Sequence, residues 1–214
     1  MNVIDCVQGT PEWAAARCGR VTASAISAVL SRSRDRKSEG ATRRNYKAQI
    51  ISEVLTGRPC EDTFTSKPIE NGKLLEPDAC TAYEVARNVF LESIGFVVHP
   101  TIERSGASPD RLIEGQKGLV EVKCPIRATH LGYLLADEVP SEYEPQIQWE
   151  LACTGYDWAD FISYNPDFPR DLQLFIKRVP RDEKRIAEIT AEVSVFLREV
   201  DQTIAQLSAL KKAA

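Results

Sequence analysis

The stretch 108–125, SPDRLIEGQKGLVEVKCP, constrains the fold of this chain more than any other part of its sequence. A short apolar run after Asp110, a glycine-bounded turn at 114–118 and a second apolar run predict a β-hairpin. Because side chains alternate between the two faces of a strand, Glu121 and Lys123 share one face of the second strand, across the turn from Asp110. The pattern fits two structures: a cation site with a lysine beside it, or a solvated hairpin with an ordinary Glu/Lys face.

The residue types of this hairpin suit a hard cation. Carboxylates such as those of Asp110 and Glu121 are ligands that Mg²⁺ prefers, and the peptide carbonyl of Val122 adds a further oxygen. Lys123 would lie beside a metal-bound water and help it to lose a proton, so that a phosphodiester is attacked in line. This chemistry needs neither a histidine nor a cysteine nucleophile, and the chain has only 2 histidines.

Length and composition predict a single domain, 1–214. The chain has 214 residues, of which 43% are hydrophobic and 27% charged, which is ordinary globular usage. No apolar run approaches the ~18–20 residues that span a bilayer, and the N-terminus lacks the pattern of a signal peptide. The 6 cysteines include no Cys-x-x-Cys pair, which favours thiols in a reducing cytoplasm over a zinc ribbon or a disulfide framework. The net charge of −4 leaves the partner undecided, since a local basic groove can coexist with an acidic exterior.

Helical and strand patterns follow one another along the chain without an internal repeat. Strand patterns lie on both sides of the hairpin, at 96–98 before it and at 158–164 and 172–179 after it, whereas 105–109 is predicted to be a loop. The C-terminal segment 181–210 has the most regular apolar stripe and predicts a long helix. Further helices are predicted at 10–17, 25–30, 45–57, 69–93 and 141–155.

Two polar stretches have both a structural and a DNA-binding interpretation. Arg17 and Ser24 lie near a predicted helix start, where the backbone N–H groups either form an anion pocket or are simply capped. The segment 31–47 is polar and basic, and its charge predicts either contact with a phosphate backbone or a solvated loop. Its arginines considered for DNA binding are Arg32, Arg34, Arg43 and Arg44.

Five motifs occur in an order that resembles the lambda-exonuclease, or viral recombinase, family of PD-(D/E)XK nucleases. They are RCGRVTAS at 17–24, NGKLLEPDA at 71–79, SPDRL at 108–112, EVKCP at 121–125 and YEPQIQ at 143–148. The resemblance extends over about 13–164, most of the chain. It implies an α/β fold: a single restriction-endonuclease-like domain with a central mixed β-sheet flanked by helices, and a long C-terminal helix.

The resemblance also implies roles for matching residues. Asp110, Glu121 and the Val122 carbonyl would bind the metal, with Glu76 near a second metal position. Lys123 would be the catalytic lysine. A glutamine of the YEPQIQ element would help to place the scissile phosphate or its attacking water; Gln146 is the candidate, and Gln148 remains the alternative. The residues implied for the 5′-phosphate of the DNA end are Arg17, Ser24 and Ser108.

The activity implied by the family is Mg²⁺-dependent 5′→3′ digestion of double-stranded DNA, with Mn²⁺ as a substitute. It leaves a 3′ single strand for a single-strand annealing protein in recombination. A homo-trimeric ring is implied as well, with no membrane partner, and segment 32–47 would line the DNA entrance. Two alternatives stay open: a structure- or site-specific endonuclease on the same core, and a non-catalytic DNA-binding module.

Overall fold

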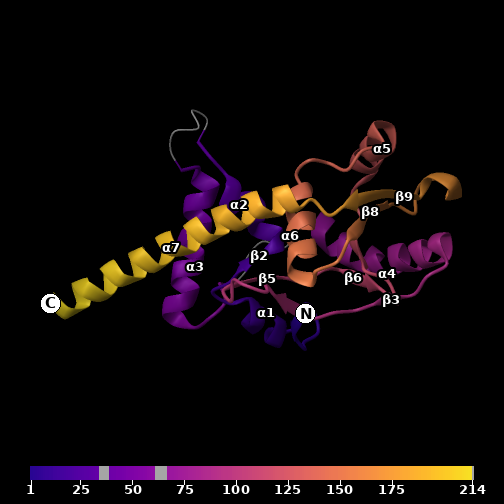
Figure 1. The fold of residues 1–214 in the computed structure, drawn as a ribbon. Helices are drawn as coiled ribbons and strands as arrows, with labels where there is room; N and C mark the ends of the chain where they lie inside the picture. The colour runs from indigo at the N-terminus through magenta and orange to yellow at the C-terminus, as the bar shows by residue number, and fades with distance from the viewer. Residues whose placement is uncertain (34–38, 61–66, 214) are drawn as a thin grey trace.

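The computed structural model describes residues 1–33, 39–60 and 67–213, in which helices surround two mixed β-sheets (Figure 1). This arrangement confirms the predicted α/β class, with flanking helices and a long C-terminal helix. The sequence suggested one central sheet, and the structure divides the strands between two. Segments 34–38 and 61–66 lie outside the described residues, and with them the predicted DNA-binding Arg34.

The larger sheet has five strands in the order β3-β6-β7-β8-β9. Strands β7 and β8 are parallel, whereas the other neighbouring pairs are antiparallel. The carboxyl ends of β7 and β8 therefore meet at one edge of the sheet, where Lys123 and Ser163 are register partners. The strands are β3 (Leu91–Glu92), β6 (Arg111–Ile113), β7 (Gly118–Lys123), β8 (Trp158–Tyr164) and β9 (Leu174–Pro180).

The predicted hairpin is the β6–β7 pair at the centre of this sheet. Arg111 pairs with Val120, and Leu112 pairs with Leu119. This register determines on which face of the sheet each later side chain of β7 lies. Gly118 begins β7 against the indole of Trp158, and a Cβ there would lie 2.4 Å from the ring. A glycine at this position therefore allows β7 and β8 to approach, and this contact sets the start of their parallel register.

A smaller sheet has the order β1-β4-β5-β2. The loop predicted at 105–109 is wrong over its first three residues, because Ser105–Ala107 form β5 between β4 and β2. Their small side chains give no β-branched or aromatic signal, and Gly106 is needed because a Cβ there would meet Phe96 and the Val97 carbonyl at 2.4 Å. The other strands are β1 (Asn2–Ile4), β2 (Val21–Thr22) and β4 (Phe96–Val98).

Helices cover both faces of the larger sheet. Side chains of Ile113, Val120 and Val122 pack with helix α4, while Leu112 and Leu119 join the main core with α6 and α7. The alternation predicted for β7 is thus present, and it turns Glu121 and Lys123 toward α6. The α-helices are α1 (Pro11–Arg17), α2 (Ile26–Leu30), α3 (Ala41–Thr56), α4 (Lys67–Arg87), α5 (Arg127–Ala136), α6 (Glu144–Thr154) and α7 (Glu183–Ala213), with 3₁₀ turns η1 (Ala23–Ala25) and η2 (Arg170–Leu172).

Helix boundaries differ from the prediction where tertiary contacts decide them. Helix α4 ends at Arg87 instead of near 93, because Asn88 takes a left-handed conformation (φ 53°) and β3 pairs with β6. Helix α3 begins four residues earlier than expected, at Ala41, and α5 was not predicted.

The C-terminal helix α7 confirms the predicted long helix, and its apolar stripe is largely buried, from Ile186 to Val200. Its C-terminal end projects beyond the body of the molecule (Figure 1), and there Leu207 and Leu210 are 42% and 67% exposed. Among the described residues, no helix combines the length and apolarity needed to cross a bilayer.

Candidate active site

Asp110 lies between β5 and β6, at the start of the hairpin, and points across it. Its Oδ2 accepts a hydrogen bond from the backbone N–H of Val122 at 2.8 Å. This bond places the carboxylate beside the strand that carries Glu121, as the hairpin pattern predicts. The two acidic side chains lie close enough for Glu121 to raise the pKa of Asp110.

Glu121 is 1% exposed and is the centre of the site. Its Oε1 accepts hydrogen bonds from the Lys123 ammonium and, at 2.6 Å, from Nε2 of Gln146 on α6. The Lys123 ammonium also lies 5.0 Å from the centre of the Tyr143 ring, a cation–π contact. The structure therefore brings Asp110, Glu121, Lys123 and Gln146 together from segments far apart in the sequence.

Helix α6 contributes a residue that the sequence analysis missed. The Gln146 amide also donates to Oε1 of Glu150 at 2.9 Å, and Glu150 is 1% exposed. The two residues are four apart, so they lie on one helix face. That spacing, together with a glutamate between Trp149 and Leu151, is the signal available in the sequence. Gln148 faces elsewhere: its amide bonds the Pro180 carbonyl and the Asp182 N–H at 2.9 Å, next to the start of α7.

Burial and crowding of the carboxylates perturb their protonation. Burial, followed by repulsion from Glu121, raises the pKa of Asp110 to about 8. The same two causes raise the pKa of Glu150 well above its ordinary value. Burial alone would lower the pKa of Lys123, but Glu121 and Asp110 outweigh it and raise that pKa, so the side chain stays an ammonium. Its positive charge thereby compensates part of the negative charge of Glu121 and Asp110.

The donor set of this cluster fits a divalent cation. Oε2 of Glu121 and Oε2 of Glu150 are both buried and have no hydrogen-bond partner within the described part of the chain. Buried carboxylate oxygens without partners are costly unless a cation or a proton compensates them. Among the described residues, no three His, Cys, Asp or Glu side chains are already gathered as a metal-binding group. Oε1 of Glu121 is occupied by Lys123 and Gln146.

Glu76 approaches the cluster from α4 and is engaged by an arginine. Its Oε1 lies 2.9 Å from Nη1 of Arg111, the residue after Asp110. Nη1 also donates to the backbone carbonyl of Asp110. The predicted second-metal role of Glu76 therefore stays a prediction, and Arg111 is a second residue that the sequence analysis did not single out.

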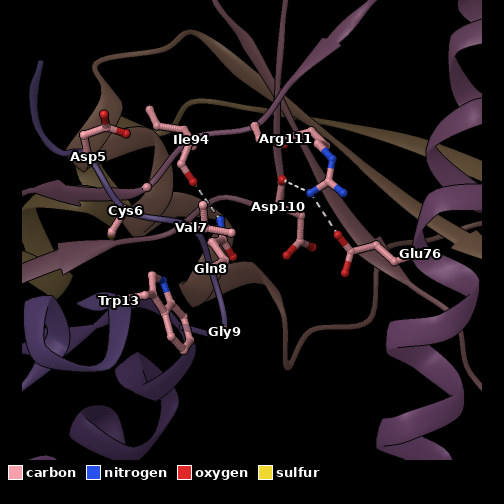
Figure 2. Close-up of a pocket in the computed structure, with 12 residues that line it drawn as sticks. Asp5, Cys6, Val7, Gln8, Gly9, Trp13, Glu76, Ile94, Asp110 and Arg111 are labelled. Carbon is pink, nitrogen blue, oxygen red and sulfur yellow. Dashed lines mark hydrogen bonds and ion pairs between the residues drawn. The ribbon is translucent and has the colours of Figure 1, made fainter. Parts of the chain in front are cut away.

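A cleft of about 550 Å³ opens beside Asp110, Glu76 and Arg111 (Figure 2). The N-terminal segment 5–9 forms its other wall and is tied down by Gln8, whose amide donates to the carbonyls of Ile94 (3.0 Å) and Pro109 (2.8 Å). Trp13 also lines it. A DNA strand entering this cleft would thus pass directly beside Asp110 and Glu76.

Trp13 connects the residues predicted to bind a 5′-phosphate. Its indole N–H donates to the Ser108 hydroxyl at 2.8 Å, and the Arg17 guanidinium stacks over its ring at 4.0 Å. Ser24 is exposed, and its hydroxyl lies 3.4 Å from that of Thr22. The structure thus joins Arg17 and Ser108 through one aromatic side chain that lines the cleft.

The basic residues of segment 31–47 have different surroundings. Arg43 is 3% exposed and bonds Glu199 at 2.8 Å, so its guanidinium ties α3 to α7 and is not presented to DNA. Arg32 is paired with Glu192 at 2.6 Å, and Arg44 is exposed. Of these arginines, Arg44 and the partly exposed Arg32 remain predictions for DNA contact.

Comparison with known proteins places this geometry in a family. The model of the YqaJ-like viral recombinase domain matches residues 12–157. The chain belongs to the YqaJ-like viral recombinase family. No curated protein sequence matches it.

Solved structures agree with this membership. The alkaline exonuclease LHK-Exo from Laribacter hongkongensis is 39% identical, with a TM-score of 0.87 over 96% of this chain and 100% of that one. The same enzyme in complex with dAMP matches equally well. A phage-related exonuclease from Haemophilus somnus 129PT is 16% identical with a TM-score of 0.68, over 88% of this chain and 96% of that one, and shares the fold. This YqaJ-like chain is therefore a nuclease related to alkaline exonucleases.

Proposed function

We propose that this chain is a Mg²⁺-dependent 5′→3′ exonuclease that digests one strand of linear double-stranded DNA and leaves a 3′ single strand. Mn²⁺ would substitute for Mg²⁺. The observation that carries the proposal is the convergence of Asp110, which lines the cleft, with the hydrogen-bonded side chains of Glu121, Lys123 and Gln146.

Asp110, Glu121 and the Val122 carbonyl would hold the cation. When bound, it would polarise the phosphodiester and activate a water for in-line attack. The buried, unpartnered Oε2 of Glu121 and the raised pKa of Asp110 support this role, because both indicate that Lys123 alone does not compensate the negative charge of the two carboxylates.

Lys123 and Gln146 would position the attacking water and the scissile phosphate. The Lys123 ammonium brings a fixed positive charge to the place where negative charge develops on the phosphate. Glu121 and Glu150 both accept from Nε2 of Gln146, so they fix the orientation of its amide. The amide oxygen is then free to accept from a water.

Preference for an end would come from Arg17 and Ser108. Both contact Trp13, which lines the cleft, and a guanidinium and a hydroxyl suit the 5′-phosphate. Ser24 would join them on binding DNA. Gly19, between Arg17 and Ser24, has a left-handed backbone (φ 69°), and its N–H donates to the buried Glu53 carboxylate at 2.8 Å. Glu53 thereby holds the loop that follows Arg17.

A homo-trimeric ring, a single-strand annealing partner and a cytoplasmic location belong to the same proposal. Exposed apolar side chains at the projecting end of α7, such as Leu210, support an oligomer. Sedimentation of the purified protein tests this: a species of three chains is expected, and a monomer at assay concentration would remove the ring.

The decisive experiment is digestion of linear duplex with 5′-phosphate or 5′-hydroxyl ends, labelled separately on each strand, with closed circular duplex in parallel. Mononucleotides should be released first from the 5′ label, faster from phosphorylated ends and only with Mg²⁺ or Mn²⁺. Cutting of closed circles would favour an endonuclease. Release of the 3′ label first would reverse the polarity, and equal rates on both ends would remove the Arg17/Ser108 pocket.

A further inference from the structure

The ion pair between Glu76 and Arg111 joins two elements at the mouth of the cleft. Figure 2 shows the Arg111 guanidinium between the carbonyl of Asp110 and the carboxylate of Glu76. The Glu76–Arg111 distance is 2.9 Å, and the two side chains are 30% and 22% exposed. Both line the cleft together with Asp110. The pair is therefore accessible to a molecule in the cleft and lies beside the catalytic cluster.

The contacts of Arg111 leave much of its guanidinium available. An arginine carries five N–H donors in a planar fork that matches two oxygens of a phosphate. Within the described part of the chain, Nη1 makes both contacts of the guanidinium: an ion pair with Glu76 and a hydrogen bond to the Asp110 carbonyl. The Nη2 and Nε groups are thus unused by the protein at a site that faces the cleft.

Glu76 holds this guanidinium from a different element. Arg111 begins β6, and its backbone pairs with Val120, while Glu76 is on α4. A long side chain that is fixed at one nitrogen loses less freedom when its other donors bind a ligand. The carboxylate of Glu76 therefore orients the guanidinium.

We propose that Arg111 binds a non-bridging oxygen of the phosphodiester that lies in the cleft, and that Glu76 is its positioning residue. The inference rests on the proposed nuclease function and assigns the substrate's phosphate to a residue outside the carboxylate–lysine cluster. A guanidinium beside the scissile phosphate also stabilises the charge that develops there during attack. We therefore also predict that Glu76 is not required for metal binding.

Four variants test the pair: Arg111→Gln, Arg111→Lys, Glu76→Gln and the double variant Glu76→Gln/Arg111→Gln. Loss of the guanidinium should lower kcat/KM on 5′-phosphorylated linear duplex by ~10²-fold. Lysine keeps the charge but not the fork, so a loss of about tenfold is expected. Glu76→Gln should lose roughly tenfold, and the double variant should be no worse than Arg111→Gln, because the two residues act as one unit.

Two measurements separate this role from a metal-binding or a purely structural one. The Mg²⁺ concentration that gives half of the metal-induced rise in Tm should change less than about twofold in Glu76→Gln. In a chelator, the binding of a 5′-phosphorylated oligonucleotide, followed by anisotropy against salt, should lose about one unit of log–log slope in Arg111→Gln. The matched control is Arg87→Gln on α4, the helix that also carries Glu76. This variant removes a guanidinium that lies 3.9 Å from Asp160 and does not line the cleft. It should leave both measurements unchanged.

Three results would overturn the inference: a Mg²⁺ requirement in Glu76→Gln that rises tenfold or more, an unchanged salt slope in Arg111→Gln, or losses that multiply in the double variant. If the wild type digests no linear duplex, the proposed function fails. The salt slope would still decide whether Arg111 binds phosphate.

Discussion

Replacing Glu150 by glutamine should make the metal-free protein more stable. Glu150 is 1% exposed; one of its carboxylate oxygens accepts from Gln146, and the other has no partner within the described residues. Glutamine has nearly the same shape, and its amide oxygen can still accept the Gln146 hydrogen bond. The substitution therefore removes a buried ionisable group next to Glu121 and keeps the hydrogen bond from Gln146.

The magnitude follows from the cost of keeping the buried carboxyl uncharged. Each pH unit above the unfolded pKa costs up to about 1.4 kcal/mol, and for a chain of this length each kcal/mol shifts Tm by roughly 2–4 °C. Glu150→Gln should therefore raise the Tm in a chelator by roughly 3–6 °C for each pH unit over which Glu150 keeps its proton only in the folded state.

The rise in Tm of Glu150→Gln over the wild type should depend on pH in a defined direction. Burial, and then repulsion by Glu121, raise the pKa of Glu150, so the folded protein keeps a proton that the unfolded chain releases at lower pH. This stability is present below the unfolded pKa and is lost as the pH rises toward the folded pKa. The loss is at most about 1.4 kcal/mol per pH unit for this group. The advantage of the variant should therefore grow from mildly acidic to alkaline pH.

The assay is thermal or urea unfolding of both proteins in a chelator at several pH values, and again with Mg²⁺. Mg²⁺ should stabilise the wild type more than the variant and so reduce the difference in Tm between the two proteins. Glu114→Gln, on the exposed turn between β6 and β7, is the matched control and should change nothing. An equal or lower Tm for Glu150→Gln in the chelator at alkaline pH would refute the reasoning that this carboxylate is uncompensated.

Further variants test the lysine, the metal requirement, the end-binding residues and the buried core charge. Lys123→Ala should slow single-turnover digestion by at least ~10²-fold with an unchanged circular dichroism spectrum, and retained digestion would locate the active site elsewhere. The Mg²⁺ concentration for half-maximal activity should fall as the pH rises through about 8, because Asp110 must lose its proton to bind a cation; a flat profile would contradict this. Trp13→Phe removes the hydrogen bond to Ser108 and should reduce the preference for 5′-phosphate about fivefold, for about 1 kcal/mol lost. Asp160→Asn should lower the free energy of unfolding in urea by about 3 kcal/mol, since this buried carboxylate pairs with Arg178 at 2.8 Å; a loss below about 1 kcal/mol would show that the pair is dispensable.

Local patterns predicted the hairpin and the long C-terminal helix because each depends on neighbouring residues. The alternation along β7 assigned Glu121 and Lys123 to one face, and the register with β6 bears this out. The stripe from Ile186 to Val200 predicted a buried helix face and is buried. In contrast, the sequence predicts a loop where β5 lies, because Ser105 and Gly106 become a strand only through pairing with β2 and β4.

The partners of the site residues depend on contacts between distant segments. Gln146 and Gln148 are indistinguishable as letters in YEPQIQ. The angular position of each on α6 decides that one bonds Glu121 and the other the start of α7. Arg43 belonged to a basic run in the sequence, and the packing of α3 on α7 buries it against Glu199. Such pairings are long-range, and a one-dimensional pattern does not contain them.

The sequence by itself therefore determined the chemistry of this protein: which oxygen-bearing and cationic side chains it has, and which of them share a strand. The tertiary structure decided how these charges are compensated. It placed Oε1 of Glu150 beside Gln146 and left Oε2 without a partner among the described residues. It also paired Arg111 with Glu76. The physical reason is that the cost of a charge depends on its burial and its neighbours, and both are set only when α4 and α6 pack against the sheet.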